Sequence, residues 1–261
     1  MLPDFEMIIH KFPEREDITI IPIADVHLGA RECMEQEFIS FIDSIKDKPN
    51  VYLVLGGDLI NNATRSSVSN IFEEVMRPAD QTKEMAKILA PVADKILAAV
   101  SGNHERRSGK DADDDPAYDI MCKIDREDIY RENMAFVKMQ FGNTKADGEY
   151  NPTYTIVVTH GAGGGALTSG AVLKGERMGY AIDGMDALIM GHTHKPFTTQ
   201  PGKIVIDGHN NKVSIKPFKV INMTSWLAYG GYSAQKMLLP SSHCLQTLTL
   251  RGNRKEMVVT M

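Results

Sequence analysis

The sequence lacks the features that mark secreted, disulfide-rich or membrane-spanning proteins. Its 261 residues include only three cysteines, Cys33, Cys122 and Cys244, and their odd number and wide spacing argue against a disulfide framework or a structural zinc site. No apolar run reaches the roughly 18 residues of a membrane span, and the N-terminus carries acids and prolines where a signal peptide needs a basic start. We therefore expect a cytoplasmic protein without a membrane partner.

A basic surplus is missing as well. The formal net charge is -5, so no positive field of the whole chain draws it onto nucleic acid or anionic lipid. The sequence also has no repeat, no low-complexity tract and no linker. With 43% apolar and 24% charged residues it has an ordinary globular composition. We expect residues 1–261 to form a single domain with a deep core.

What the sequence does have is a regular alternation of apolar strands and helical segments. The runs ITIIPIAD, VYLVLGGD, ILAAVSGN, YTIVVTHG and DALIMGHT are typical of buried strands that end in small or polar residues. Helical character lies between them, over 35–46, over 67–95 with breaks near Pro78 and Pro91, and over 167–180. Beyond Lys195, turn-rich strands predict a second, antiparallel sheet. The pattern predicts an α/β fold with two packed sheets.

Polar side chains of the types that bind metals follow each of these five runs. The positions are Asp25 and His27, Asp58, Asn103 and His104, His160, and His192 and His194. Asp25 and His27 are alternate residues of a segment expected to be extended, which would point both side chains the same way. His10, His209 and His243 do not follow such runs. Strand ends are where a rigid scaffold can aim several ligands at one point.

A single histidine or aspartate at a strand end is usually a hydrogen-bonded turn residue. The full set is different, because it would crowd carboxylates and imidazoles together in a buried place without a counter-ion, which is expensive. A pair of divalent cations resolves that conflict. We therefore predict a metal site at the ends of these strands.

Five ordered motifs resemble the calcineurin-like metallophosphoesterases. They are D-V-H-L-G at Asp25, G-G-D ending at Asp58, G-N-H-E at Gly102, T-H-G at Thr159 and G-H-T-H at Gly191. The resemblance implies a four-layer α/β/β/α sandwich of two mixed sheets flanked by helices. It also implies one metal held by Asp25, His27 and His194, another held by Asn103, His160 and His192, and Asp58 bridging both.

The chemistry expected from such a site is phosphoester hydrolysis. Two cations about 3.5 to 4 Å apart can share a water, lower its pKa toward neutrality and clamp the phosphoryl oxygens. His104, not itself assigned to a metal, is the candidate catalytic acid for the leaving oxygen, or else a residue that orients its neighbours. Manganese is expected from the resemblance, while the mixed nitrogen and oxygen ligands also suit Fe, Zn, Ni or Mg.

The opening motif is most similar to that of the SbcD and Mre11 type nucleases, which favours a phosphodiesterase or nuclease acting on DNA or nucleotides. Arg106, Arg107 and Lys110, in a loop just beyond His104, are candidates to grip a phosphate backbone, or form a solvated loop balanced by the acids of 111–115. Trp226 and Tyr229 are candidates to stack a base, or pack in the core. A phosphomonoesterase or cyclic-nucleotide phosphodiesterase remains an alternative.

Two interpretations from other classes compete with the hydrolase. The segment from Gly161 to Ala166 formally matches the G-x-G-x-x-A dinucleotide fingerprint, with Asp183 further on. That match is disfavoured because Asp183 does not end an apolar strand and because His160, directly before the segment, is already a candidate metal ligand. A non-catalytic interaction scaffold is the other alternative. The sequence leaves the natural substrate and the oligomeric state open.

Overall fold

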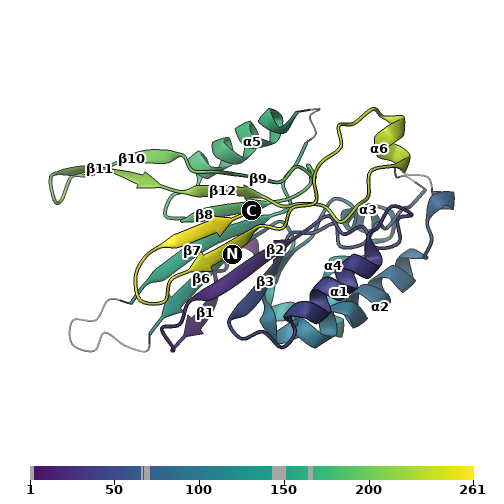
Figure 1. Cartoon of the computed structure of the whole chain (residues 1–261), viewed down its shortest axis with the longest axis horizontal. Coiled ribbons are helices and arrows are strands. Elements are labelled where there is room, and N and C mark those ends of the chain that lie inside the picture. The colour runs from purple at the N-terminus through teal and green to yellow at the C-terminus, as the bar shows by residue number, and fades with distance from the viewer. Residues whose placement is uncertain (1–2, 66, 68–70, 143–150, 164–166) are drawn as a thin grey trace.

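Two β-sheets face each other in the computed structural model, which describes residues 3–65, 67, 71–142, 151–163 and 167–261 (Figure 1). The first sheet has the order β1–β6–β7–β8–β12–β9, with β1 at Ile8–Phe12, β6 at Met134–Phe141, β7 at Thr153–Thr159, β8 at Ala187–Met190, β12 at Lys219–Asn222 and β9 at Phe197–Thr199. The second has the order β14–β13–β2–β3–β4–β5, with β14 at Met257–Thr260, β13 at Thr247–Leu250, β2 at Ile18–Ile23, β3 at Val51–Leu55, β4 at Ile96–Val100 and β5 at Tyr130–Arg131.

Both sheets are mixed. In the second sheet β2, β3, β4 and β5 run parallel, and β13 joins antiparallel to β2. In the first, β7, β8 and β12 run parallel, and β6 is antiparallel to β7. The inner faces touch through β4, which is buried along its whole length and contacts β6 and β7.

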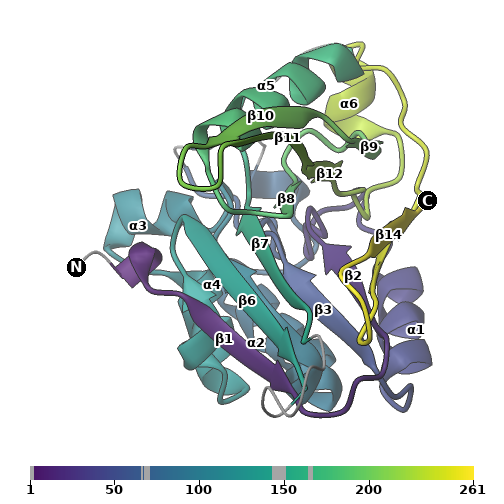
Figure 2. The ribbon, with the colours of Figure 1, turned by 90° about the vertical axis from the view of Figure 1, so that its left-hand side faces the viewer.

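Helices cover the outer faces and complete four layers. α5 (Thr168–Ala181) lies on the first sheet, and α1 (Glu35–Ile45), α2 (Pro78–Leu89) and α4 (Pro116–Lys123) lie on the second (Figure 2). In α1, Phe38, Ile42 and Ile45 are buried in the common core, and their spacing puts them on one helical face. α2 begins with Pro78 at its first position, where the missing N–H is tolerated. The α/β/β/α sandwich of two mixed sheets is thus confirmed.

The smaller elements lie at the ends of the sandwich. α3 (Arg106–Ala112) and α6 (Gly231–Gln235) flank the ends of the strands (Figure 1). The 3-10 turns are η1 (Pro3–Phe5), η2 (Ile71–Glu73), η3 (Ala90–Lys95) and η4 (Glu127–Ile129). Among the described residues, no helix is both long and apolar enough to cross a bilayer.

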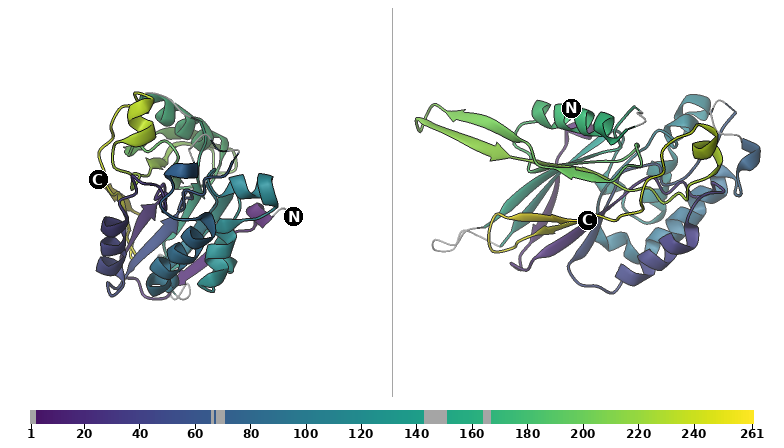
Figure 3. Two further views of the ribbon diagram at one scale, coloured as in Figure 1. Left: turned by 90° about the vertical axis from the view of Figure 1, so that its right-hand side faces the viewer. Right: turned by 45° about the horizontal axis from the view of Figure 1, so that its top comes forward.

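The prediction of a second, antiparallel sheet beyond Lys195 is confirmed only for two strands. β12 and β9 extend the first sheet, and β13 and β14 extend the second. Of the strands that the structure describes, β10 (Gly202–Asp207) and β11 (Lys212–Pro217) alone stand apart, as an antiparallel hairpin that projects from the body (Figure 3). The reason lies in burial, because three of the four residues of β12 are buried between strands while the hairpin stays exposed.

Candidate metal centre and active site

Seven polar side chains converge where the parallel strands of both sheets end. Each comes from a short segment directly after a strand, in the order β2, β3, β4, β7 and β8: Asp25 and His27, Asp58, Asn103, His160, and His192 and His194. The structure therefore brings together the residues that the sequence singled out. Asp25, His27, Asp58 and His160 are buried, while Asn103, His192 and His194 are half-buried.

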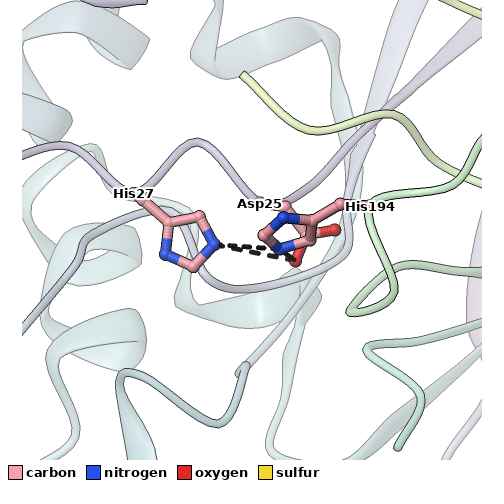
Figure 4. A group of neighbouring side chains, drawn as sticks. All are labelled: Asp25, His27 and His194. Carbon is pink, nitrogen blue, oxygen red and sulfur yellow. Dashed lines mark hydrogen bonds and ion pairs between the residues drawn. The ribbon is translucent and has the colours of Figure 1, made fainter. Parts of the chain in front are cut away.

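Asp25, His27 and His194 form the first group. Their ligand atoms all lie within 4.8 Å of one another, and the three side chains point toward a common centre (Figure 4). The Nε2 atom of His194 is 3.3 Å from Asp25 Oδ1, and the Nε2 atoms of His27 and His194 are 3.2 Å apart. This is the donor set that the resemblance assigned to one metal.

Asp58, His160 and His192 form the second group, and Asn103 adds an amide oxygen to it. Asn103 Oδ1 lies 2.9 Å from His160 Nε2 and 2.7 Å from His192 Nδ1. Asp58 Oδ2 is 3.2 Å from His160 Nε2 and 3.9 Å from His27 Nε2. One carboxylate oxygen of Asp58 therefore lies between the two groups.

The loops that carry these side chains have an unusual backbone. Five of the residues have positive φ, between 51° and 71°: Asp25, His27, Asp58, His192 and His194. Non-glycine residues adopt this left-handed conformation rarely, at a cost of about 1 to 3 kcal/mol each, and they cluster at functional sites when they do. The expectation of an extended segment at Asp25 and His27 is thus wrong, because β2 ends at Ile23.

Two glycines make the close approach of these loops feasible. Gly57 has a φ of +83°, and a Cβ there would lie 2.4 Å from the backbone nitrogen of Gly102. A Cβ on Gly102 would in turn lie 2.1 Å from Asp58 Oδ1. Both positions require glycine, because the turn after β3 rests directly on the turn after β4.

The hydrogen-bond pattern fits bound cations. His160 Nδ1 lies 2.8 Å from the carbonyl oxygen of Gly56, which can only accept, so Nδ1 carries a proton. In the neutral ring, Nε2 then directs a lone pair toward Asn103 Oδ1 and Asp58 Oδ2, which offer only lone pairs in return. Acceptors facing acceptors in a buried place call for a positive charge among them. A divalent cation fits this donor set of imidazole, carboxylate and amide oxygen.

The pKa values of these residues show the same need for a positive charge in the site. Burial lowers the pKa of His160, but the Asp58 carboxylate outweighs it and raises that pKa to about 9. Burial and the neighbouring His104 hold the pKa of His27 well below its usual value. For Asp58, burial acts to raise the pKa, but His104 and His160 outweigh it and hold the pKa well below its usual range. The site thus keeps the Asp58 carboxylate anionic beside crowded imidazoles.

His104 lies beside both groups, and one of its ring nitrogens lies within 4.8 Å of ligand atoms of His27 and Asp58. Its Nε2 atom is 3.8 Å from Asp58 Oδ2, and its Nδ1 atom is 2.8 Å from the carbonyl oxygen of Asn61. Arg107 reaches the same ring, with its guanidinium 3.0 Å from Nε2 and 3.1 Å from the Asn61 oxygen. The Asn61 carbonyl and Arg107 thus hold the His104 ring beside the candidate metal ligands.

Glu105 is a residue that the sequence reasoning used only as a motif letter. Its buried carboxylate accepts hydrogen bonds from the backbone N–H groups of Asp58, Leu59, Ile60 and Gly102 at 2.6 to 3.2 Å. It therefore ties the Asp58 loop to the Asn103–His104 turn. Burial, and then the adjacent Asp58, raise the pKa of Glu105 to about 7. The sequence signal was the fixed place of Glu105 directly after His104.

The expected loop from Glu105 to Lys110 is instead the helix α3. The sequence of this helix has no apolar stripe to predict it. Its arginines hold it in place through hydrogen bonds instead. Arg106 donates to the carbonyl oxygens of Ser101 at 2.8 Å and Glu132 at 3.1 Å, so its guanidinium is engaged within the fold. Arg107 is half-buried beside His104, and Lys110 is exposed in the last turn of the helix.

The two aromatic candidates have different places. Trp226 is 2% exposed and packs against Phe38, Phe41 and His243, so of the two alternatives for this residue the structure supports core packing and not base stacking. The reason is that the core below α1 needs a large apolar group at this position. Tyr229 is 54% exposed, and its hydroxyl donates to the Leu238 carbonyl at 3.0 Å. Only Tyr229 remains available to a ligand.

The glycine-rich segment after His160 falls partly outside the described residues, at 164–166. Gly161 has a φ of +86° and leads the chain away from β7 close to Gly191 and Met190. Asp183 follows α5 in the connection to β8, as expected for a residue that does not end a strand.

Comparisons with known proteins give a family match and similar solved structures. A search of the curated proteins gives no significant match. Among solved structures, an uncharacterized protein described as a predicted phosphoesterase from Streptococcus pneumoniae TIGR4 is similar at 11% identity, with a TM-score of 0.39 over 94% of this chain and 98% of the other. The NAD nucleotidase NadN of Haemophilus influenzae is similar at 10% identity, with a TM-score of 0.38, and this chain spans 49% of its length. The family model of the calcineurin-like phosphoesterases matches residues 18–196. With the motifs of the metal centre inside that range, the chain belongs to the calcineurin-like phosphoesterase family.

Proposed function

We propose that the protein is a dinuclear-metal phosphodiesterase that acts on DNA or nucleotides. The observation that carries the proposal is the position of Asp58 Oδ2, which lies between the Asp25–His27–His194 group and the His160–His192 group. A carboxylate in that position can bridge two cations, and the amide oxygen of Asn103 completes the second set. Mixed nitrogen and oxygen donors suit manganese first, with Fe, Zn, Ni or Mg as alternatives.

Bound divalent cations would lower the pKa of a shared water and take up charge on the phosphoryl oxygens. The residues of the chain do the rest. Glu105 fixes the loop of Asp58 through four backbone hydrogen bonds. His104, directly after Asn103, lies where it can deliver a proton to the leaving oxygen of the ester.

The preference for a diester rests on the cations beside His104. The Arg107 guanidinium is within hydrogen-bond distance of His104, and Lys110 lies one helical turn further along α3. Both can contact a second phosphate of a polynucleotide, a group that a monoester lacks. Tyr229 adds an exposed aromatic ring near α6.

Metal content and substrate preference test the proposal together. Protein loaded with manganese is expected to hold two metal ions per chain and to turn over an activated diester and DNA faster than a phosphomonoester. Asp58→Asn should lower the metal content and abolish turnover, because an amide cannot neutralise two cations. Asp47→Asn, at an exposed position after α1, is the matched control and should change neither quantity.

The possible failures are distinguishable. Asp58→Asn with two metals and the wild-type rate would remove the bridging role. Wild-type protein that turns over only a monoester or a cyclic nucleotide would overturn the diester preference. Two bound metals without turnover of any ester in the panel would favour a non-catalytic scaffold.

A further inference from the structure

The β10–β11 hairpin has one face made only of apolar residues. Register pairs Ile204 with Ile215 and Ile206 with Val213, and directly paired residues of a hairpin point to the same side. These four side chains are 76%, 74%, 76% and 67% exposed, in that order. Gly202 and Pro217 extend the same face toward the body. Such a contiguous apolar patch on a soluble domain marks an interaction site.

The opposite face is polar and is the one attached to the molecule. It carries the pairs Lys203–Lys216, Val205–Ser214 and Asp207–Lys212, of which Val205 is the one apolar member. The ammonium of Lys203 donates to the carbonyl oxygen of Ile182, just after α5, and lies 5.3 Å from the centre of the Phe218 ring. The apolar face is therefore turned away from α5. In Figure 3 the ribbon projects beyond the sandwich, where it is open to contact.

The hairpin is a built element rather than a loose loop. Asp207 Oδ1 accepts from the backbone N–H groups of His209 and Asn210, at 3.1 and 3.0 Å, which fixes the turn. All six residues of β10 pair with β11. Isoleucine and valine stabilise strands mainly by packing against a neighbour, and an isolated two-stranded hairpin is only marginally stable in water. A row of isoleucine and valine side chains on one face of the hairpin is therefore typical of a sheet face that is buried against another surface.

We propose that this face is the contact of a homodimer, in which Ile204, Ile206, Val213 and Ile215 of two copies pack on each other about a twofold axis. A twofold contact places the same patch against itself, so the patch must be self-complementary. These four side chains meet that condition, because none carries a charge or a hydrogen-bonding group that would need a different partner. The lysines lie on the far side of each ribbon, away from the contact.

The area fits a concentration-dependent dimer. Burying one aliphatic side chain removes about 100 Å² of apolar surface from water. Four from each copy give about 800 Å², and the ribbon backbone and flanking residues bring the total near the ~1,000 Å² that a specific interface needs. The contact thus lies at the lower end of the areas of specific interfaces, and we expect the dimer to dissociate on dilution.

Adjacent residues of β11 provide a matched pair of variants. Ile215→Lys adds a charge to the apolar face, and Ser214→Lys adds the same charge to the polar face of the same strand. Sedimentation velocity from low to several hundred micromolar protein should show a dimer for wild type and for Ser214→Lys. Ile215→Lys should raise the dimer Kd at least about tenfold, because its ammonium would be buried without a partner.

Folding and activity controls keep the result interpretable. Each variant should retain the wild-type circular dichroism spectrum and phosphoesterase rate, since the hairpin contributes no residue to the metal centre. Ile215→Thr, which keeps the branched shape, should weaken the dimer less than Ile215→Lys does. A wild-type monomer at every concentration overturns the proposal, and so does an equal weakening by Ile215→Lys and Ser214→Lys.

Discussion

Arg107 donates a hydrogen bond to Nε2 of His104 across 3.0 Å, on the side of the ring that faces the metal centre. The other ring nitrogen, Nδ1, lies 2.8 Å from the Asn61 carbonyl oxygen, so it carries the proton. Nε2 is then the atom through which we propose that His104 acts as an acid, and it accepts from Arg107 until the ring takes up a second proton. His104 is thus the proposed acid, and Arg107 is the residue that donates a hydrogen bond to it.

His104→Ala should keep both metals and lose activity by about 10² to 10⁴ for an ester with a poor leaving group. The loss should be much smaller for a nitrophenyl ester, because that leaving group hardly needs a proton. Steady-state rates on the two esters give the comparison, with His209→Ala at the exposed hairpin turn as control. Equal losses on both esters would assign His104 to positioning instead.

Arg107→Gln should raise KM for DNA and flatten its salt dependence, by about 0.7 to 0.9 in the log-log slope per lost phosphate contact. A small activated diester should be affected little, because it offers no second phosphate. Lys110→Gln should act in the same direction. Arg106→Gln is the control, since its guanidinium binds the carbonyls of Ser101 and Glu132 and its loss should lower stability without changing the slope.

Glu105→Gln should loosen the metal centre without touching a metal ligand. The amide has one oxygen for the four backbone N–H donors. Its NH₂ group would face backbone N–H groups, from which it cannot accept a hydrogen bond. A loss of about 1 to 3 kcal/mol of unfolding free energy is expected, together with weaker metal binding. Urea unfolding and metal titration measure the two effects, and Glu37→Gln on exposed α1 is the control. An unchanged urea midpoint would show that the carboxylate does not hold the loops.

Trp226→Ala and Tyr229→Ala should differ in stability, because Trp226 lies in the core and Tyr229 on the surface. Trp226 fills the space between Phe38 and Phe41, so its truncation should cost about 3 to 5 kcal/mol of stability. Tyr229→Ala should stay within about 0.5 kcal/mol. If Tyr229 stacks a base, its loss should weaken binding of single-stranded DNA by about 1 to 3 kcal/mol. Unchanged binding would remove Tyr229 from the substrate site.

The sequence predicted the strands because buried strands and strand-end polar residues are local signals, whereas the layer order followed from the resemblance to the metallophosphoesterases. Asp25, His160 and His192 could be named in advance for this reason. The left-handed backbone at Asp25 and His27 could not, because it depends on how the loop after β2 rests on the loop after β3. Hydrogen bonds from Asp25 N to the Gly57 oxygen and from His27 N to the Asp58 oxygen, both 3.0 Å, impose it.

The same contrast explains the residues around the site. Trp226 sits in a turn-rich segment that suggests a surface, and only the packing of α1 shows that the ring is buried. The sequence of α3 has no apolar stripe. Arg106 and Arg107 instead anchor the helix by hydrogen bonds to the carbonyl oxygens of Glu132 and Asn61, which are distant in sequence. Interactions between segments that are far apart along the chain leave no periodic pattern to find.

His10 links the two sheets and should make stability depend on pH. It lies on β1 of the first sheet, and its Nε2 is 2.8 Å from the carbonyl oxygen of Leu97 on β4 of the second. Burial, aided by the Arg126 guanidinium, lowers the pKa of His10 below its usual value near 6.5, although the Leu97 bond and Asp128 act against this. The folded protein therefore binds this proton less readily than the unfolded chain does.

The direction in which the unfolding free energy changes with pH follows from the linkage between proton binding and folding. A group with a lowered pKa in the folded state contributes stability that is fully present above the unfolded pKa near 6.5 and is lost as pH falls toward the folded pKa. His10→Gln keeps a donor for Leu97 but does not titrate, so its unfolding free energy should fall less than that of wild type between neutral pH and pH about 5. Urea unfolding of metal-free protein at a series of pH values measures this difference, and the histidines of the metal centre cancel because both proteins share them. His209→Gln, at an exposed turn, should follow the wild-type curve. Parallel curves for His10→Gln and wild type would mean that His10 titrates alike in the folded and unfolded states.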